Sequence, residues 1–147
     1  DPFGVTFTKD FDELKDLRMS KDEQIRYFSG KAIYRSNFEL DNTINQNNIY
    51  LNLGNVMVIA KVRINGKEVG GLWTRPWRIE VSDYLKEGQN NLEIVVANNW
   101  VNRLTGDAKL KADERVTWLS LNQFKPDGQL QPSGLLGPVT IETTDSK

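Results

Sequence analysis

Three of the four tryptophans in this sequence stand in two short segments rich in arginine, amide and carboxylate side chains. The segments are "WTRPW" and "WVNRLTGD". The C–H face of a pyranose packs on an indole ring, while guanidinium, amide and carboxylate groups pair with its hydroxyls. The two segments therefore predict a carbohydrate-binding surface. The predicted binding residues are Trp73, Arg75, Trp77, Trp100, Asn102, Arg103 and Asp107.

The same residues have a structural alternative. Tryptophans on sandwich strands usually belong to the core, and Arg103 with Asp107 can simply staple a long loop. Trp73 and Trp77 flank Pro76, which cannot continue a paired central strand. We therefore expect at least one of these two indoles to be exposed.

The missing residue types exclude several kinds of chemistry. The chain has no Cys and no His, which rules out Ser-His-Asp and Cys-His nucleophiles and zinc sites built on His or thiolate. We predict no cofactor, no metal site and no catalytic residue. A glycosidase that uses two carboxylates stays open as a third reading, because their separation is spatial. The net charge of −1 argues against a nucleic-acid partner.

The spacing of apolar residues predicts an all-β fold. Apolar residues alternate with polar ones in at least five runs, which is the period of a half-buried strand. Asn65-Gly66 directly follows one such run and predicts a type I′ hairpin turn. Roughly eight strands without a long amphipathic helix between them indicate an antiparallel sandwich. The alternating runs are 32–40, 49–53, 60–64, 79–81 and 92–96.

Near the N-terminus the period changes. Phe11, Leu14 and Leu17 recur every three residues, and Asp10 with Glu13 has the spacing of a capping box, so a short helix or a few helical turns are expected there. The 147 residues predict one domain over 1–147. No apolar run approaches the roughly 18 residues that span a bilayer, so no membrane insertion is expected. The start at Asp1 suggests a mature form or a piece excised from a larger protein.

Four segments together resemble a known domain. "YFSGKAIYRSNFEL", the region from "VRINGKEVGGLW" to "NNWVNRLTGD", "PSGLLGPVTIE" and the leading "VTFTKDFDELKD" are similar to the sugar-binding β-sandwich domain of glycoside hydrolase family 2. The closest resemblance is to the domain at the C-terminal end of bacterial α-L-rhamnosidase-like enzymes of family 106. The resemblance covers about residues 5–142.

This resemblance implies a galactose-binding-like jelly roll of about eight antiparallel strands. It implies a non-catalytic accessory domain of a multidomain glycoside hydrolase, one that recognises carbohydrate or positions the substrate. Its partners would be an oligo- or polysaccharide and the catalytic domain of the parent chain. The alternative is a scaffold module that packs against that catalytic domain without binding sugar. Export to the periplasm or the extracellular space is expected from the resemblance alone.

Overall fold

The computed structural model describes residues 7–41, 48–120 and 123–144. The described elements are strands, apart from short helical turns and one helix of seven residues. The helical elements are η1 Leu17–Met19, α1 Glu23–Arg26, η2 Ser82–Tyr84 and α2 Val101–Asp107. The strands are β1 Gly30–Leu40, β2 Ile49–Asn52, β3 Asn55–Met57, β4 Ile59–Ile64, β5 Lys67–Leu72, β6 Arg78–Glu80, β7 Gly88–Asn98, β8 Gly134–Gly137 and β9 Thr140–Thr143.

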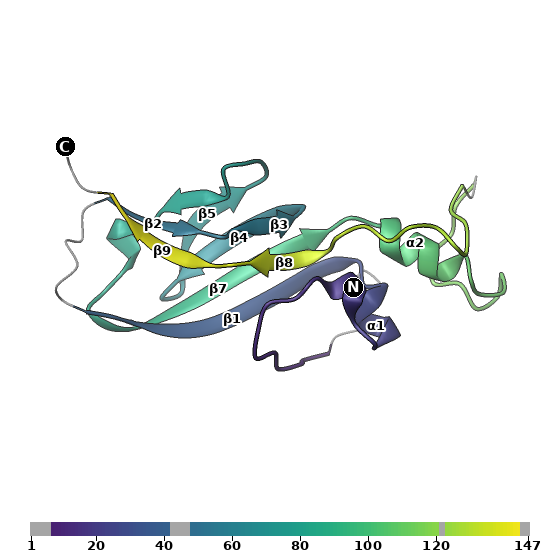
Figure 1. Ribbon diagram of the computed structural model, residues 1–147, viewed down its shortest axis with the longest axis horizontal. Helices are drawn as coiled ribbons and strands as arrows, with labels where there is room; N and C mark the ends of the chain where they lie inside the picture. Colours follow the sequence, from purple (N-terminus) through teal and green to yellow (C-terminus); the bar gives the residue numbers. More distant parts are fainter. Residues whose placement is uncertain (1–6, 42–47, 121–122, 145–147) are drawn as a thin grey trace.

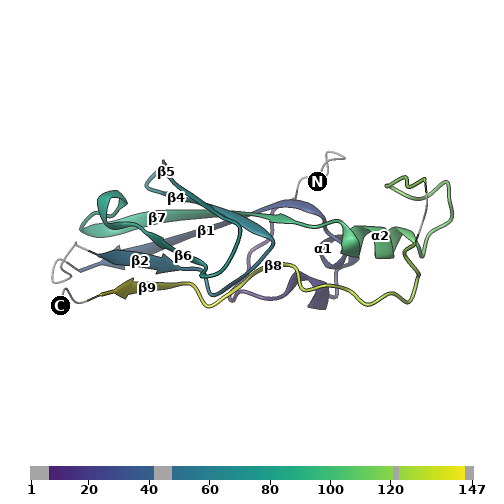
Figure 2. The same ribbon diagram turned by 90° about the horizontal axis from the view of Figure 1, so that it is seen from above.

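The strands form two layers. One sheet has the order β1-β7-β4-β5, and the facing strands form a sheet of order β6-β2-β9 and the pair β3-β8. All the strand pairs within these sheets are antiparallel. Figures 1 and 2 show the long strands β1 and β7 lying behind β2, β9 and β8. The predicted all-β, antiparallel sandwich is confirmed.

The core lies between the layers and follows the predicted alternation. In β4 the side chains of Ala60, Val62 and Ile64 are fully buried, and the residues between them are exposed. The strands β2 and β7 repeat this pattern. Full burial of one aliphatic side chain of this size contributes about 1.5–3 kcal/mol. The apolar face of each strand therefore fixes which side of the sheet faces the other layer.

The hairpin between β4 and β5 has the predicted turn. Asn65 and Gly66 have φ values of 51° and 80°. Positive φ at both central positions is the requirement of a type I′ turn, whose twist matches the twist of the two strands. A single helical turn, η2, follows Val81 after β6.

The expected short helical segment near the N-terminus is present as η1 and α1, which Asp16 and Asp22 cap. It begins later than the Asp10–Glu13 spacing indicates, because residues 10–16 are not helical. Phe11 is exposed, Leu14 packs against the main core, and Leu17 belongs to a second small cluster. Three apolar residues with different destinations cannot share one helix face, and a local cap alone does not stabilise so short a helix.

Beyond the sheet end, the chain builds a projection that we call the arm, residues 101–120 and 123–132. Both views show α2 and the loop after it extending past the ends of the strands (Figures 1 and 2). The sequence reading treated Trp100–Asp107 as loop-like, whereas residues 101–107 form α2. The helix was missed because it is short and its buried residues include Asn102 and Asp107, which carry no apolar signal.

Candidate functional site

Trp73 lies at the outer face of the four-stranded sheet, where β5 ends. Leu72 pairs with Ala60, and both point into the core. Continuing this register by one residue places Trp73 opposite Ile59, which faces outward. Trp73 is 73% exposed, so the expectation of an exposed indole beside Pro76 is confirmed.

The residues beside Trp73 on this face are small or aliphatic, apart from Lys61, which pairs with Gly71. Gly71 precedes it by two residues, and a Cβ built there meets only the Ala60 carbonyl oxygen, at 3.7 Å. Ile59 pairs with Ala97 of β7, so small and aliphatic residues continue the surface across two more strands. An indole beside such a surface presents an open stacking face.

The loop from Trp73 to Trp77 is held by contacts at its far end. Arg75 Nη2 donates a hydrogen bond to Asn55 Oδ1 at 3.1 Å, and the Leu53 amide donates to the Trp77 carbonyl oxygen at 2.7 Å. Trp77 is half-buried and packs against the main core. The structure therefore separates the two predicted aromatics: Trp77 anchors the loop, and Trp73 faces solvent.

A polar network that the sequence reading missed lies on the outer face of the sheet β6-β2-β9. The Arg78 guanidinium stacks over the Tyr50 ring, 3.8 Å from its centroid, and Arg78 Nε pairs with a Glu142 carboxylate oxygen at 3.1 Å. Asn52 Nδ2 donates to the other oxygen of Glu142 at 2.6 Å. The sequence contains a signal for this network, because the alternation along 49–52 puts Tyr50 and Asn52 on the face opposite the core.

Trp100 stands at the same end of the four-stranded sheet as Trp73, just after β7. It is exposed and occupies the N-cap position of α2. The strands that carry Trp73 and Trp100 both flank β4, so the two indoles extend from neighbouring parts of one sheet end. Arg103 lies on α2 and is half-buried.

Asn102 and Asp107 point inward from α2. Asn102 is 1% exposed, and its amide exchanges two hydrogen bonds of 2.8 Å with the backbone of Gln131. Asp107 is 3% exposed, and its Oδ2 accepts from the Thr117 amide at 2.7 Å and from the Thr117 hydroxyl at 2.6 Å. These side chains hold the arm in shape, which leaves the exposed aromatic and Arg residues as the surface available to a ligand.

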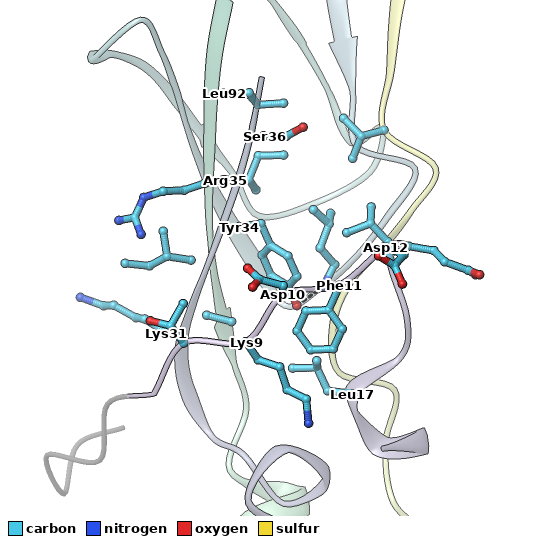
Figure 3. A pocket seen from close by; sticks show the side chains of 18 of the residues that line it. Lys9, Asp10, Phe11, Asp12, Leu17, Lys31, Tyr34, Arg35, Ser36 and Leu92 are labelled. Carbon is cyan, nitrogen blue, oxygen red and sulfur yellow. Dashed lines mark hydrogen bonds between the residues drawn. The ribbon is translucent and has the colours of Figure 1, made fainter. Parts of the chain in front are cut away.

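A cavity of about 780 Å³ lies elsewhere, between β1 and the segment 7–14. Figure 3 shows Tyr34 and Phe11 inside it, while Arg35 points away. Its interior is lined by core side chains of both layers, among them Leu51 and Leu92. Charged residues such as Lys9, Asp10 and Lys31 share this lining. None of the seven predicted carbohydrate-binding residues lines this cleft.

Tyr34 in this cleft gives the fold a testable pH dependence. Burial raises the pKa of the Tyr34 phenol above its ordinary value, although the Leu135 amide, which donates to Tyr34 Oη at 3.1 Å, opposes the shift. The contribution of neutral Tyr34 to stability is therefore complete below the unfolded pKa of about 10 and declines as the pH rises through the folded pKa. In urea melts between pH 8 and 11, Tyr34→Phe should flatten this decline. A decline of unchanged steepness would assign it to other groups.

The described residues carry no group of three or more His, Cys, Asp or Glu that could hold a metal ion. Within the same residues, no helix is long and apolar enough to cross a membrane.

The chain is similar to parts of much longer proteins. It is 38% identical, over 93% of its length, to a Formosa agariphila protein named "Putative beta-glucuronidase", of which it covers 14%. A solved rhamnosidase from Novosphingobium sp. PP1Y matches 89% of this chain with 39% identity and a TM-score of 0.82, and the match covers 12% of that enzyme. The chain thus spans about one seventh of the length of these relatives.

More distant structures share part of the fold. A β-glucuronidase from an uncultured Clostridium species matches 56% of this chain with 26% identity and a TM-score of 0.50. A family model described as "Glycosyl hydrolase 2 galactose-binding domain-like" matches residues 12–126, which is most of the sandwich and part of the arm. This chain belongs to the galactose-binding domain-like family of glycosyl hydrolase 2.

Proposed function

We propose that this chain is a non-catalytic accessory domain of a multidomain glycoside hydrolase, and that it recognises carbohydrate or positions it for a neighbouring active site. The supporting observation is the indole of Trp73, which is 73% exposed at the outer face of the four-stranded sheet in a domain of this family. An indole this exposed is available to stack on the C–H face of a sugar ring or to be buried by a partner.

The carbohydrate reading is supported by the polar groups near this indole. Arg75 is positioned by its bond to Asn55 and is itself exposed. A guanidinium and an amide offer paired donors and acceptors to vicinal hydroxyls, while the indole takes the C–H face of the ring. Trp100 at the same sheet end extends the aromatic surface. The proposed ligand-contacting residues are therefore Trp73, Arg75 and Trp100.

A titration of tryptophan fluorescence against rhamnose-, galactose- and glucuronate-containing oligosaccharides tests this proposal. One stacked aromatic and a few exposed hydrogen bonds predict weak binding, with a Kd of about 1 mM, equivalent to about −4 kcal/mol. Trp73→Ala should abolish the saturable change. The matched control is Trp118→Ala, which removes another exposed indole and should leave the titration intact.

The alternative is a scaffold module that packs against the catalytic domain of its parent without binding sugar. The exposed apolar side chains at the sheet end and on the arm favour this alternative. The titration distinguishes the two functions. A panel without any saturable change at millimolar ligand would contradict carbohydrate recognition and leave the scaffold function.

We further propose that the parent enzyme is exported to the periplasm or the extracellular space, where polysaccharide substrates are found. Fractionation of the producing cells, followed by immunodetection of this domain, tests that location. Recovery of the domain in the cytoplasm alone would contradict it.

A further inference from the structure

The arm carries a second apolar surface, separate from Trp73. Trp118 is 84% exposed, the most exposed large apolar side chain among the described residues. Leu110, Val116 and Leu119 lie on the same arm, and each is exposed by about two fifths. Monomeric proteins rarely leave several large apolar side chains together in water, because the contact is unfavourable.

Hydrogen bonds and buried polar groups shape the arm from within. Asp107 accepts two hydrogen bonds from Thr117, the residue next to Trp118. The Asn102 amide forms hydrogen bonds with the backbone of Gln131, in the segment that leads back to β8. Arg115 Nε donates to the Leu110 carbonyl oxygen at 3.2 Å. Polar groups thus hold the backbone while the apolar side chains point outward. Because the surface is already ordered in the free domain, binding does not have to supply the free energy of ordering it. This favours tight docking.

The surface also has a hollow that a protruding side chain can enter. A pocket of about 260 Å³ lies beside Trp118. Its other lining residues are the apolar Leu104, Ala112 and Leu119 and the polar Asp107, Arg115 and Thr117. An exposed tryptophan next to a hollow is the arrangement of an interface hot spot, in which anchor residues from both partners interlock.

We propose that Leu110, Val116, Trp118 and Leu119 form a docking surface for another domain of the same polypeptide. The inference rests on the proposed function only in placing this chain within a larger glycoside hydrolase. The relatives support that occupant, since the matched segment is 14% of one polypeptide and 12% of the other. A covalent tether gives a neighbouring domain a high effective concentration at this surface.

The chemistry of the surface favours an apolar protein face over a sugar or a charged partner. Two leucines and a valine offer no groups for hydroxyls. The charged residues of the arm nearly balance, with Lys111 and Arg115 near Asp113 and Glu114. The partner face should therefore be aliphatic or aromatic, with one acceptor for the indole N–H. The domain then uses different tryptophans for two tasks: Trp73 for carbohydrate and Trp118 for its neighbour.

The test is oxidative footprinting by hydroxyl radicals, read by mass spectrometry, on this chain alone and on the full polypeptide that contains it. In the isolated chain, Trp118 and Trp73 should oxidise at similar rates, because they are 84% and 73% exposed. In the full polypeptide, burial at an interface should slow the oxidation of Trp118 about tenfold. Trp73 should keep its rate and serves as the internal control. Equal rates for Trp118 in both proteins would overturn the proposal.

A variant separates docking from folding. Trp118→Ala should leave the Tm of the isolated chain unchanged, because its side chain is mostly in water. In the full polypeptide the same substitution should speed proteolytic release of this domain severalfold. Release at an unchanged rate would contradict docking through Trp118. A concentration-dependent dimer of the isolated chain with Trp118 protected would overturn the proposed occupant in favour of a second copy. Loss of sugar binding by Trp73→Ala is independent of all these outcomes.

Discussion

Replacing Gly54 with alanine is expected to destabilise the domain by more than about 4 kcal/mol, enough to leave much of it unfolded. Gly54 has a φ of +65° and forms a bridge with Gly137. A Cβ at this position would overlap the Gly137 carbonyl group and stand 2.6 Å from the Pro138 carbonyl oxygen. Both obstacles are backbone atoms, so no side chain can move aside. Urea denaturation followed by circular dichroism measures the effect.

Gly66→Ala is the matched control for this prediction. Gly66 also has positive φ, at +80°, but a Cβ there meets nothing within 4 Å. Gly66→Ala should therefore lower the free energy of unfolding by only about 1–2 kcal/mol, which is the penalty for placing an L-residue at positive φ. Equal losses at the two positions would show that backbone conformation, and not the close approach of Gly54 to Gly137, determines the effect.

Asn90→Ala is expected to lower the free energy of unfolding by about 3 kcal/mol or more, because it leaves several buried polar groups without hydrogen-bond partners. Asn90 is 0% exposed, and its amide Nδ2 donates to the carbonyl oxygens of Lys86 and Gly88 at 2.7 and 2.9 Å. Its Oδ1 accepts from the Lys86 amide at 3.0 Å and from Asn65 Nδ2 at 2.8 Å. One side chain therefore joins the turn before β7 to the β4–β5 hairpin.

The exposed neighbour Asn91 supplies the comparison. Asn91→Ala should change the free energy of unfolding by no more than about 0.5 kcal/mol, as for other surface substitutions. Thermal and urea melts of both variants give the difference. A loss below about 1 kcal/mol for Asn90→Ala would mean that water replaces its four bonds at little cost.

The arrangement of tryptophans bears on how such a domain serves an enzyme. Trp73 ends a strand of the sheet, and Trp118 stands on the arm beyond it. A domain docked through the arm would keep its sheet face free. Carbohydrate held on that face would then lie at a fixed place relative to the rest of the enzyme, and weak binding would suffice because the site is tethered.

The amino-acid sequence alone determined the fold class, most strands and the main hairpin of this protein. These features depend on local rules: alternation sorts the side chains of β4 and β7 into inner and outer sets, and Asn65-Gly66 tolerates positive φ at both turn positions. The exposure of an indole beside Pro76 followed from equally local backbone chemistry. Family membership followed from the order of short motifs along the chain.

Only the tertiary structure decided which polar residues face solvent. Asn102 and Arg103 are neighbours in sequence, yet Asn102 is buried against Gln131 whereas Arg103 is half-buried. Asp107 is buried and accepts a hydrogen bond from the amide of Thr117, ten residues later. The destinations of Phe11, Leu14 and Leu17 depended in the same way on packing against distant elements. A hydrogen bond across a long loop leaves no period in the sequence, because its partner is chosen by the fold and not by spacing. For the same reason the sequence did not single out Trp118, whose exposure depends on how the arm folds back onto α2.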